Sequence, residues 1–254
     1  MTREETWLLN EKYGGEKSFA FFADCERLAA GEPLGYVIGY VPFLDCTIHL
    51  DSRPLIPRVE TEYWVERAIA AIREAGDTQR RPLRVLDMCA GSGCIGVAVA
   101  AATPDAAVTF AEIDPVHLPT IQKNLDDIPS VHQRNNDRYQ IVQSDLFANV
   151  SGTFDYILTN PPYIDPALDR TDPSVKDYEP AHALYGGTNG MEVISQLIQA
   201  VPQHLAHGGA VWLEHEPEQV TALKDCATAC GLTAAAHSDQ YGTPRYSILT
   251  RRQT

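Results

Sequence analysis

The sequence lacks several features that would assign the chain to a class at once. Its six cysteines include no C-x-x-C pair, which disfavours a zinc site, and a chain of 254 residues does not need a disulfide framework. We therefore expect reduced cysteines in a cytosolic-type, cytoplasmic location. The longest apolar run, around residues 94–102, is too short to span a membrane. The acidic N-terminal stretch has no apolar core of signal-peptide length.

Basic residues are also scarce. Lysine and arginine number 20 against 34 aspartate and glutamate, which gives a formal net charge of -14 and a pI of about 4.9. Tight binding to bare nucleic acid depends on cations that neutralise phosphates, so this balance disfavours it. A neutral or basic protein partner fits the sign of the charge better.

From about residue 82 onward, short apolar runs alternate with helical patterns. Strands are predicted over 83–88, 106–113, 138–143, 154–159 and 209–216, and two final ones, 232–238 and 245–252, are expected to be antiparallel. Helices are predicted over 93–102, 117–128, 190–205 and 217–231. This alternation predicts an α/β fold, namely a seven-stranded, doubly wound, mostly parallel sheet covered on both faces.

The first 80 residues follow a different pattern. A short helix is predicted over 16–31, a β-hairpin over 36–51 and an amphipathic helix over 60–76. We expect a small N-terminal appendage over residues 1–55 and one large domain over 56–254.

The segment FDYILTNPPYIDP, residues 154–166, joins a buried strand to two prolines. Neither proline has an N–H to donate, so strand pairing stops there. Asn160 and Tyr163 are then expected at the strand's carboxyl end, on a stiff and exposed turn, where open α/β sheets bind ligands. A proline-rich turn with a polar cap is the alternative.

A glycine-rich turn follows the first sheet strand in VLDMCAGSGCIG, residues 85–96. The strand ends at Asp87, and Gly91 and Gly93 allow a ligand to approach the backbone at a helix N-terminus. The G-x-G-x-x-G pattern is not met in the usual register, because Cys89 stands where the first glycine would be. The turn has no Walker lysine, which argues against a nucleoside triphosphate.

An acid ends the next strand. Glu112 follows Asp87 by 25 residues, a place from which a carboxylate can accept two hydrogen bonds from a ribose diol. Asp114 is the competitor, but it precedes Pro115 and suits a helix N-cap better. We therefore predict the ribose contact for Glu112.

The third strand ends in QSDLF. Asp145 is suited to accept a hydrogen bond from an exocyclic amine, and Leu146 or Phe147 to cover a flat ring. An ordinary strand-end turn is the alternative.

This succession of strand-end motifs resembles the class I S-adenosylmethionine-dependent methyltransferases. Several segments narrow the resemblance to the HemK-type protein-(glutamine-N5) methyltransferases, which modify the Gly-Gly-Gln glutamine of peptide chain release factors. These segments are AAGEPLGYVIGYVPF, LIPRVETE, LDMCAGSGCIG, NPPYID, EPAHALYGGTNGMEVI and YGTPRYSIL. The N-P-P-Y motif alone is shared with DNA adenine methyltransferases, whereas LIPRxxTE and EPxxALxGGxxG are more particular to this family.

The resemblance implies a cofactor, a partner and a set of site residues. The cofactor is S-adenosyl-L-methionine, with S-adenosyl-L-homocysteine as product and no metal. The partner is a release factor, held in part by the N-terminal residues 1–55, and no membrane is involved. The predicted catalytic residues are Asn160, Pro161, Pro162 and Tyr163. The predicted cofactor-binding residues are Asp87, Cys89, Ala90, Gly91, Ser92, Gly93, Glu112, Asp145, Leu146 and Asn160.

Glutamine chemistry explains the N-P-P-Y residues. An amide nitrogen is a poor nucleophile, because its lone pair is delocalised into the carbonyl. The Asn160 side-chain oxygen and the Pro161 carbonyl can accept its two N–H bonds and aim the nitrogen, while the prolines hold the loop rigid. We expect Tyr163 to pack against the flat amide.

The chain departs from the family pattern at three places. Val59 follows Arg58 where the family usually has proline, Cys89 stands where the loop often begins with glycine, and the N-terminal region is short. Arg58 either shapes the substrate mouth or pairs with Glu60 or Glu62. Glu179 is expected to brace the loop after Tyr163.

Rival functions remain open at the level of sequence. The same chemistry could act on a ribosomal protein, or the acceptor could be an adenine or guanine amine of a nucleic acid. A non-catalytic cofactor-binding module is a third alternative, which the intact N-P-P-Y disfavours. The histidines His182, His215 and His237 are interpreted as surface or satisfied core groups.

Overall fold

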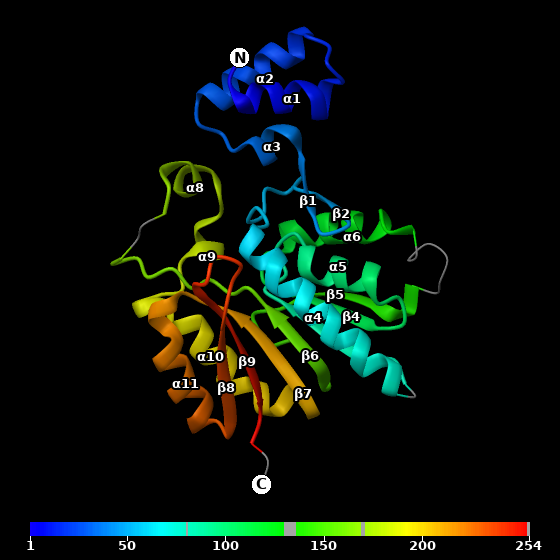
Figure 1. Cartoon of the computed structure of the whole chain (residues 1–254), viewed down its shortest axis with the longest axis vertical. Helices are drawn as coiled ribbons and strands as arrows, with labels where there is room; N and C mark the ends of the chain where they lie inside the picture. Colours follow the sequence, from blue (N-terminus) through cyan, green and yellow to red (C-terminus); the bar gives the residue numbers. More distant parts are fainter. Residues whose placement is uncertain (80, 130–135, 169–170, 253–254) are drawn as a thin grey trace.

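A seven-stranded sheet forms the centre of the molecule, with strand order β5-β4-β3-β6-β7-β9-β8 (Figure 1). The computed structural model describes residues 1–79, 81–129, 136–168 and 171–252. The strands of this sheet are β3 (Arg84–Met88), β4 (Ala107–Glu112), β5 (Tyr139–Gln143), β6 (Phe154–Thr159), β7 (Leu205–Glu214), β8 (Leu232–Ser238) and β9 (Pro244–Arg251).

The pairing of the strands confirms the predicted fold class. Strands β5, β4, β3, β6 and β7 run parallel, while β9 pairs antiparallel with both β7 and β8. Strand β7 begins four residues earlier than predicted, because Leu205 already pairs with Phe154 of β6. The helix before it covers residues 192–204 instead of the predicted 190–205.

Helices cover both faces of the sheet, as expected for a mostly parallel one. One face carries α4 (Val59–Thr78), α5 (Cys94–Ala102) and α6 (Leu118–Asp126), and the other carries α10 (Glu192–His204) and α11 (Val220–Ala229). Neighbouring strand residues alternate between the two cores, with Val85 in the first and Leu86 in the second. Within the described part of the chain, no helix combines the length and apolar character needed to cross a membrane.

Three helices and a hairpin precede α4, where the sequence predicted one helix and a hairpin. They are α1 (Arg3–Tyr13), α2 (Phe19–Ala29), α3 (Leu34–Ile38), β1 (Tyr40–Phe43) and β2 (Cys46–His49). Helix α1 begins with a capping box in which Thr2 and Glu5 bond each other's backbone N–H groups, a signal that was present in the sequence.

The N-terminal helices have a small core of their own. It contains Leu8, Leu9, Phe21 and Val37. The hairpin does not belong to it, because Phe43 and Ile48 pack in the larger core that α4, α5 and α6 form against one face of the sheet. The subdomain boundary at residue 55 stays a prediction.

The segment after β6 returns over the carboxyl ends of the strands (Figure 1). It contains α8 (Pro173–Tyr178), α9 (Ala181–Leu184) and the 3₁₀ turn η3 (Thr188–Gly190). Further 3₁₀ turns are η1 (Pro115–His117), η2 (Asn136–Arg138) and η4 (Pro217–Gln219). Neither α8 nor α9 was predicted from the sequence.

The glycine at position 96 permits close packing between α5 and β4. A Cβ added to Gly96 would lie 2.3 Å from a ring carbon of the fully buried Phe110. Gly96→Ala is expected to lower the free energy of unfolding by about 1–3 kcal/mol through overpacking. Gly76→Ala in α4 is the matched control, since its Cβ would meet Leu83 at an ordinary 3.8 Å. Equal free energies of unfolding for the two variants, measured by urea denaturation, would contradict this account.

Candidate active site

The site lies where the direction of winding reverses in the sheet. Strands β4 and β5 lie on one side of β3, and β6 and β7 on the other. Met88, the last residue of β3, pairs with Thr159, the last residue of β6. Cys89 and Asn160 therefore leave the sheet side by side, and ligands of open α/β sheets bind at this kind of crevice.

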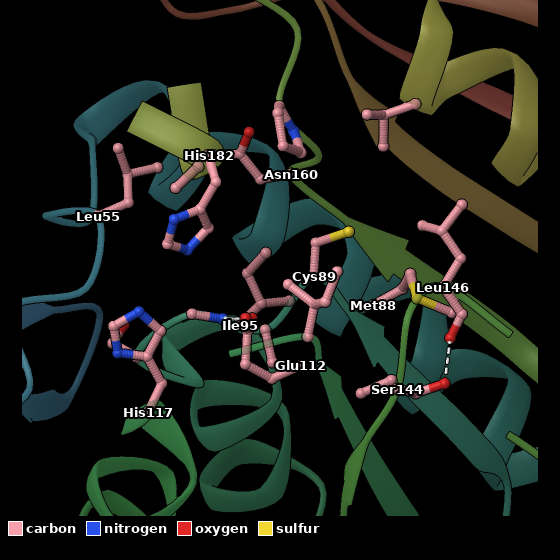
Figure 2. A pocket seen from close by; sticks show the side chains of 18 of the residues that line it. Leu55, Met88, Cys89, Ile95, Glu112, His117, Ser144, Leu146, Asn160 and His182 are labelled. Atoms are coloured by element: carbon pink, nitrogen blue, oxygen red, sulfur yellow. Dashed lines mark hydrogen bonds between the residues drawn. The ribbon is translucent and has the colours of Figure 1, made fainter. Parts of the chain in front are cut away.

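A pocket opens at this edge, and Figure 2 shows side chains from several separate segments of the chain around it. Nine of the predicted site residues line it, and they are Cys89, Ala90, Gly91, Ser92, Glu112, Asp145, Leu146, Asn160 and Pro162. The sequence reasoning missed other members of the lining, among them Leu55, Pro57, Thr61, His117 and His182. The predicted site residues Asp87, Gly93, Pro161 and Tyr163 lie outside this lining.

The backbone of the glycine-rich turn is left-handed at three residues. The φ angle is 59° at Cys89, 55° at Gly91 and 78° at Gly93. Glycine adopts this region at little cost, whereas a residue with a Cβ does so rarely. Glycine at position 89 would therefore adopt the observed backbone with less strain than cysteine does.

Asp87 lies beneath the turn rather than in the pocket. Its Oδ2 accepts a hydrogen bond of 2.8 Å from the N–H of Gly96, in the first turn of α5. Burial raises the pKa of Asp87 well above its usual range. Among the described residues, no group forms a hydrogen bond with its Oδ1. The geometry assigns Asp87 the stabilisation of the helix start, and direct contact with a cofactor stays a prediction.

Glu112 is held at the pocket wall by two backbone groups. Its carboxylate accepts hydrogen bonds from the N–H of Gly91 at 2.7 Å and of Asp114 at 2.9 Å. Each oxygen keeps a further lone pair for another donor. Asp114 instead caps η1, where its Oδ1 accepts from the N–H of Val116 at 3.0 Å. The capping role predicted for Asp114 is confirmed, and the ribose contact of Glu112 stays a prediction.

The turn after β5 forms another wall of the pocket. Ser144 donates its hydroxyl hydrogen to the carbonyl of Leu146 at 2.6 Å, and its own N–H bonds the Glu112 carbonyl (Figure 2). The Leu146 side chain faces the pocket, and Asp145 beside it is exposed. An apolar wall beside a carboxylate is suited to a flat ring that bears an amine.

The Asn160 side chain is oriented by α4. Its Nδ2 donates to Thr61 Oγ1 at 3.3 Å, and within the described residues its Oδ1 receives no hydrogen bond. The Pro161 carbonyl likewise receives no hydrogen bond from the described part of the chain. Both acceptors predicted from the sequence are thus available, and their contact with a substrate amide stays a prediction.

Tyr163 is placed differently from the prediction of an exposed turn. Its hydroxyl donates to Glu214 Oε1 at 2.9 Å, and burial raises the pKa of the tyrosine well above its usual range. The ring lines a cleft next to the pocket, together with Arg58, Asn160 and Pro161. Contact between Tyr163 and a substrate amide stays a prediction.

The turn is covered because residues 179–190 fold over it. The N–H of Ile164 donates to the Leu184 carbonyl at 2.9 Å, and the Ile164 carbonyl accepts from the N–H of Gly186 at 3.0 Å. Gln219 donates to the Tyr163 carbonyl at 2.7 Å. A Cβ on Gly186 would lie 2.4 Å from the Pro162 carbonyl, and one on Gly190 would lie 1.9 Å from that of Tyr163. Only glycines permit this approach.

Arg58 pairs with neither of the expected glutamates. Its Nη2 donates to Glu179 Oε1 at 2.6 Å, and Glu179 Oε2 accepts from the N–H of Ile56 at 3.0 Å. The buried Glu179 therefore ties the LIPR segment to the segment that covers the turn, a bracing role close to the one predicted.

Two histidines face each other at the pocket mouth. The rings of His117 and His182 lie 6.4 Å apart, and His182 Nε2 is 3.7 Å from an Asp114 oxygen (Figure 2). Burial lowers the pKa of His117. His182 was predicted to be a surface or satisfied core group, and it is exposed, but the tertiary structure also places it in the lining. His215 is a satisfied core group as expected, bonded by Glu216 and Ser247.

Comparison with known proteins identifies the family. Residues 74–175 match the methyltransferase small domain family. A release factor glutamine methyltransferase of Corynebacterium glutamicum is 34% identical over 205 residues, which cover 80% of this chain and 70% of that protein. Its counterpart in Bifidobacterium longum is 31% identical over 247 residues, covering 94% and 83%. The chain belongs to the release factor glutamine methyltransferase family.

Solved structures with the same fold are more distant in sequence. A methyltransferase of Pyrococcus furiosus aligns with a TM-score of 0.57 at 18% identity, over 89% of this chain and 96% of that one. A T. thermophilus 16S rRNA N2 G1207 methyltransferase, in complex with AdoMet and guanosine, aligns with a TM-score of 0.56 at 18% identity, over 84% and 50%. These similarities confirm the methyltransferase fold predicted from the sequence, and membership of the family confirms the predicted class of enzyme.

Proposed function

We propose that this family member transfers a methyl group from S-adenosylmethionine to the side-chain amide nitrogen of a glutamine, in the Gly-Gly-Gln motif of a peptide chain release factor. One observation carries the proposal, namely the free Oδ1 of Asn160 beside the Pro161 carbonyl at the edge of the pocket. The relatives are named for this reaction. A release factor substrate would place the enzyme in the cytoplasm.

The pocket offers groups suited to each part of the cofactor. We expect the Glu112 carboxylate to bind the ribose diol, and Leu146 with Asp145 to bind the adenine ring and its amine, since all three residues line the pocket. The turn from Cys89 to Ser92 allows close approach to the backbone. The unpartnered Asp87 Oδ1 below it can receive a hydrogen bond.

The catalytic contribution of the chain is orientation. S-adenosylmethionine, when bound, supplies an electrophilic methyl group on a sulfonium that departs as a neutral thioether. Asn160 Oδ1 and the Pro161 carbonyl accept the two N–H bonds of the glutamine amide and so aim its nitrogen. Proximity and orientation of this kind can contribute up to about 7–11 kcal/mol.

The N-terminal helices are the proposed place of protein recognition. Phe19 is 91% exposed, and Trp7 and Phe22 are also exposed on the same small unit. Exposed aromatic side chains are suited to protein interfaces. This supports, as a proposal, the substrate-recognition role of residues 1–55.

The substrate is tested by parallel incubation with labelled S-adenosylmethionine and a release factor, a ribosomal protein set or DNA. Mass spectrometry is expected to show one added methyl on the Gly-Gly-Gln glutamine, and none when that glutamine is replaced. Transfer to a ribosomal protein or to DNA, with none to the release factor, would favour one of the rival functions. The net charge of -14 already disfavours DNA.

The cofactor assignment is tested by Glu112→Ala. Loss of an ionised acceptor is expected to weaken S-adenosylmethionine binding by roughly 1.5–3 kcal/mol. Isothermal titration calorimetry measures the change, with Asp114→Ala as the comparison because Asp114 caps η1 instead. Unchanged affinity in Glu112→Ala would show that Glu112 does not contact the ribose.

A further inference from the structure

A buried hydrogen-bond chain connects the carboxyl end of β7 to Asn160. Glu214, the last residue of β7, is 1% exposed and receives three hydrogen bonds. Trp64 Nε1 and Thr61 Oγ1 each lie 2.7 Å from its Oε2, and the Tyr163 hydroxyl lies 2.9 Å from its Oε1. Thr61, itself 1% exposed, continues the chain to Asn160 Nδ2 at 3.3 Å.

The chemistry of these groups fixes the direction of every bond in the chain. The indole N–H of Trp64 can only donate, and it bonds Glu214 Oε2. An ionised carboxylate can only accept, so the single hydroxyl hydrogen of Thr61, which bonds the same oxygen, points toward Glu214. Thr61 Oγ1 then presents only lone pairs to Asn160, and an amide oxygen in that place would meet no donor.

We infer that Thr61 and Glu214 are positioning residues that force the Asn160 side chain to turn its NH2 group inward and its Oδ1 toward the substrate. This inference rests on the proposed function for what Oδ1 accepts. The orientation matters because a flipped Asn160 would offer a donor to the substrate N–H, where an acceptor is needed. An asparagine alone carries no such preference, since its oxygen and NH2 group have similar shapes.

The deciding variants are Thr61→Val and Thr61→Ser. Valine has the shape of threonine but cannot accept a bond from Asn160, whereas serine keeps the hydroxyl. Thr61→Val is expected to slow single-turnover methyl transfer by about 10- to 100-fold at saturating substrate, with cofactor affinity unchanged, as is typical for a misplaced catalytic group. Thr61→Ser is expected to restore the rate to within about threefold of the parent, by the same positioning argument.

A further variant separates positioning from general damage. Thr103→Val removes a hydroxyl that bonds the Val99 carbonyl at 2.7 Å at the far end of α5, and it should leave the rate unchanged. A parent-like rate for Thr61→Val would overturn the inference.

A readout without substrate makes the test independent of the proposed function. The side-chain NH2 resonances of Asn160, followed by ¹⁵N–¹H NMR on the whole chain, should show one hydrogen-bonded proton in the parent and in Thr61→Ser. That signature should disappear in Thr61→Val. If the parent does not methylate a release factor, the proposed function fails while the NMR comparison still decides the positioning. Identical Asn160 resonances in all three proteins would overturn it.

Discussion

Asn160→Ala is expected to slow single-turnover methyl transfer by about 10²–10³-fold, which corresponds to roughly 2.7–4 kcal/mol. The alanine removes the acceptor that aims the glutamine nitrogen. Binding of S-adenosylmethionine should change much less, because Glu112 and the glycine-rich turn remain. Rapid-quench kinetics and calorimetry on the same preparation measure the two quantities.

The fold is expected to survive this substitution. Asn160 lies in a loop at the end of β6 and contributes one long side-chain hydrogen bond to Thr61. Asn10→Ala, on the exposed surface of α1, is the control for effects of mutagenesis and purification that are unrelated to the site. Methyl transfer by Asn160→Ala at the parent rate would show that the N-P-P-Y turn only caps the strand and does not take part in catalysis.

Gly190→Ala is expected to reduce methyl transfer by about 10²-fold although Gly190 does not line the pocket. The added Cβ would lie 1.9 Å from the Tyr163 carbonyl and 2.2 Å from Gln219 Nε2, at a residue with a φ angle of 66°. The Tyr163 backbone must then move. The two prolines make the loop stiff, so the shift reaches Asn160 and Pro161.

Gly231→Ala is the matched control for Gly190→Ala. Its φ angle of 73° is also left-handed, but nothing lies within 4 Å of an added Cβ. Both variants carry the conformational cost of a left-handed alanine, and only Gly190→Ala displaces the catalytic turn. Equal rates for the two in single-turnover assays, with equal unfolding midpoints, would show that residues 186–190 do not hold the N-P-P-Y segment in place.

The sequence by itself determined the sheet, the family and nine residues of the pocket lining. Strand and helix periods are local properties of the chain, and the carboxyl ends of parallel strands must meet at one edge. Residues at the carboxyl ends of such strands could therefore be predicted to lie close together from their positions in the chain alone. Examples are Cys89, Glu112, Asp145 and Asn160. The capping role of Asp114 was also predicted correctly, because capping depends only on neighbouring residues.

Only the tertiary structure decided how the site is supported. Thr61 lies 153 residues from Glu214 and 99 from Asn160, and Arg58 lies 121 from Glu179. Such contacts depend on how α4 and the segment after β6 pack against the sheet, and no local pattern encodes that packing. The same holds for Tyr163, whose hydroxyl turns toward a buried carboxylate because residues 179–190 cover the turn. Buried donors need acceptors, and the acceptors nearest in space are distant in sequence.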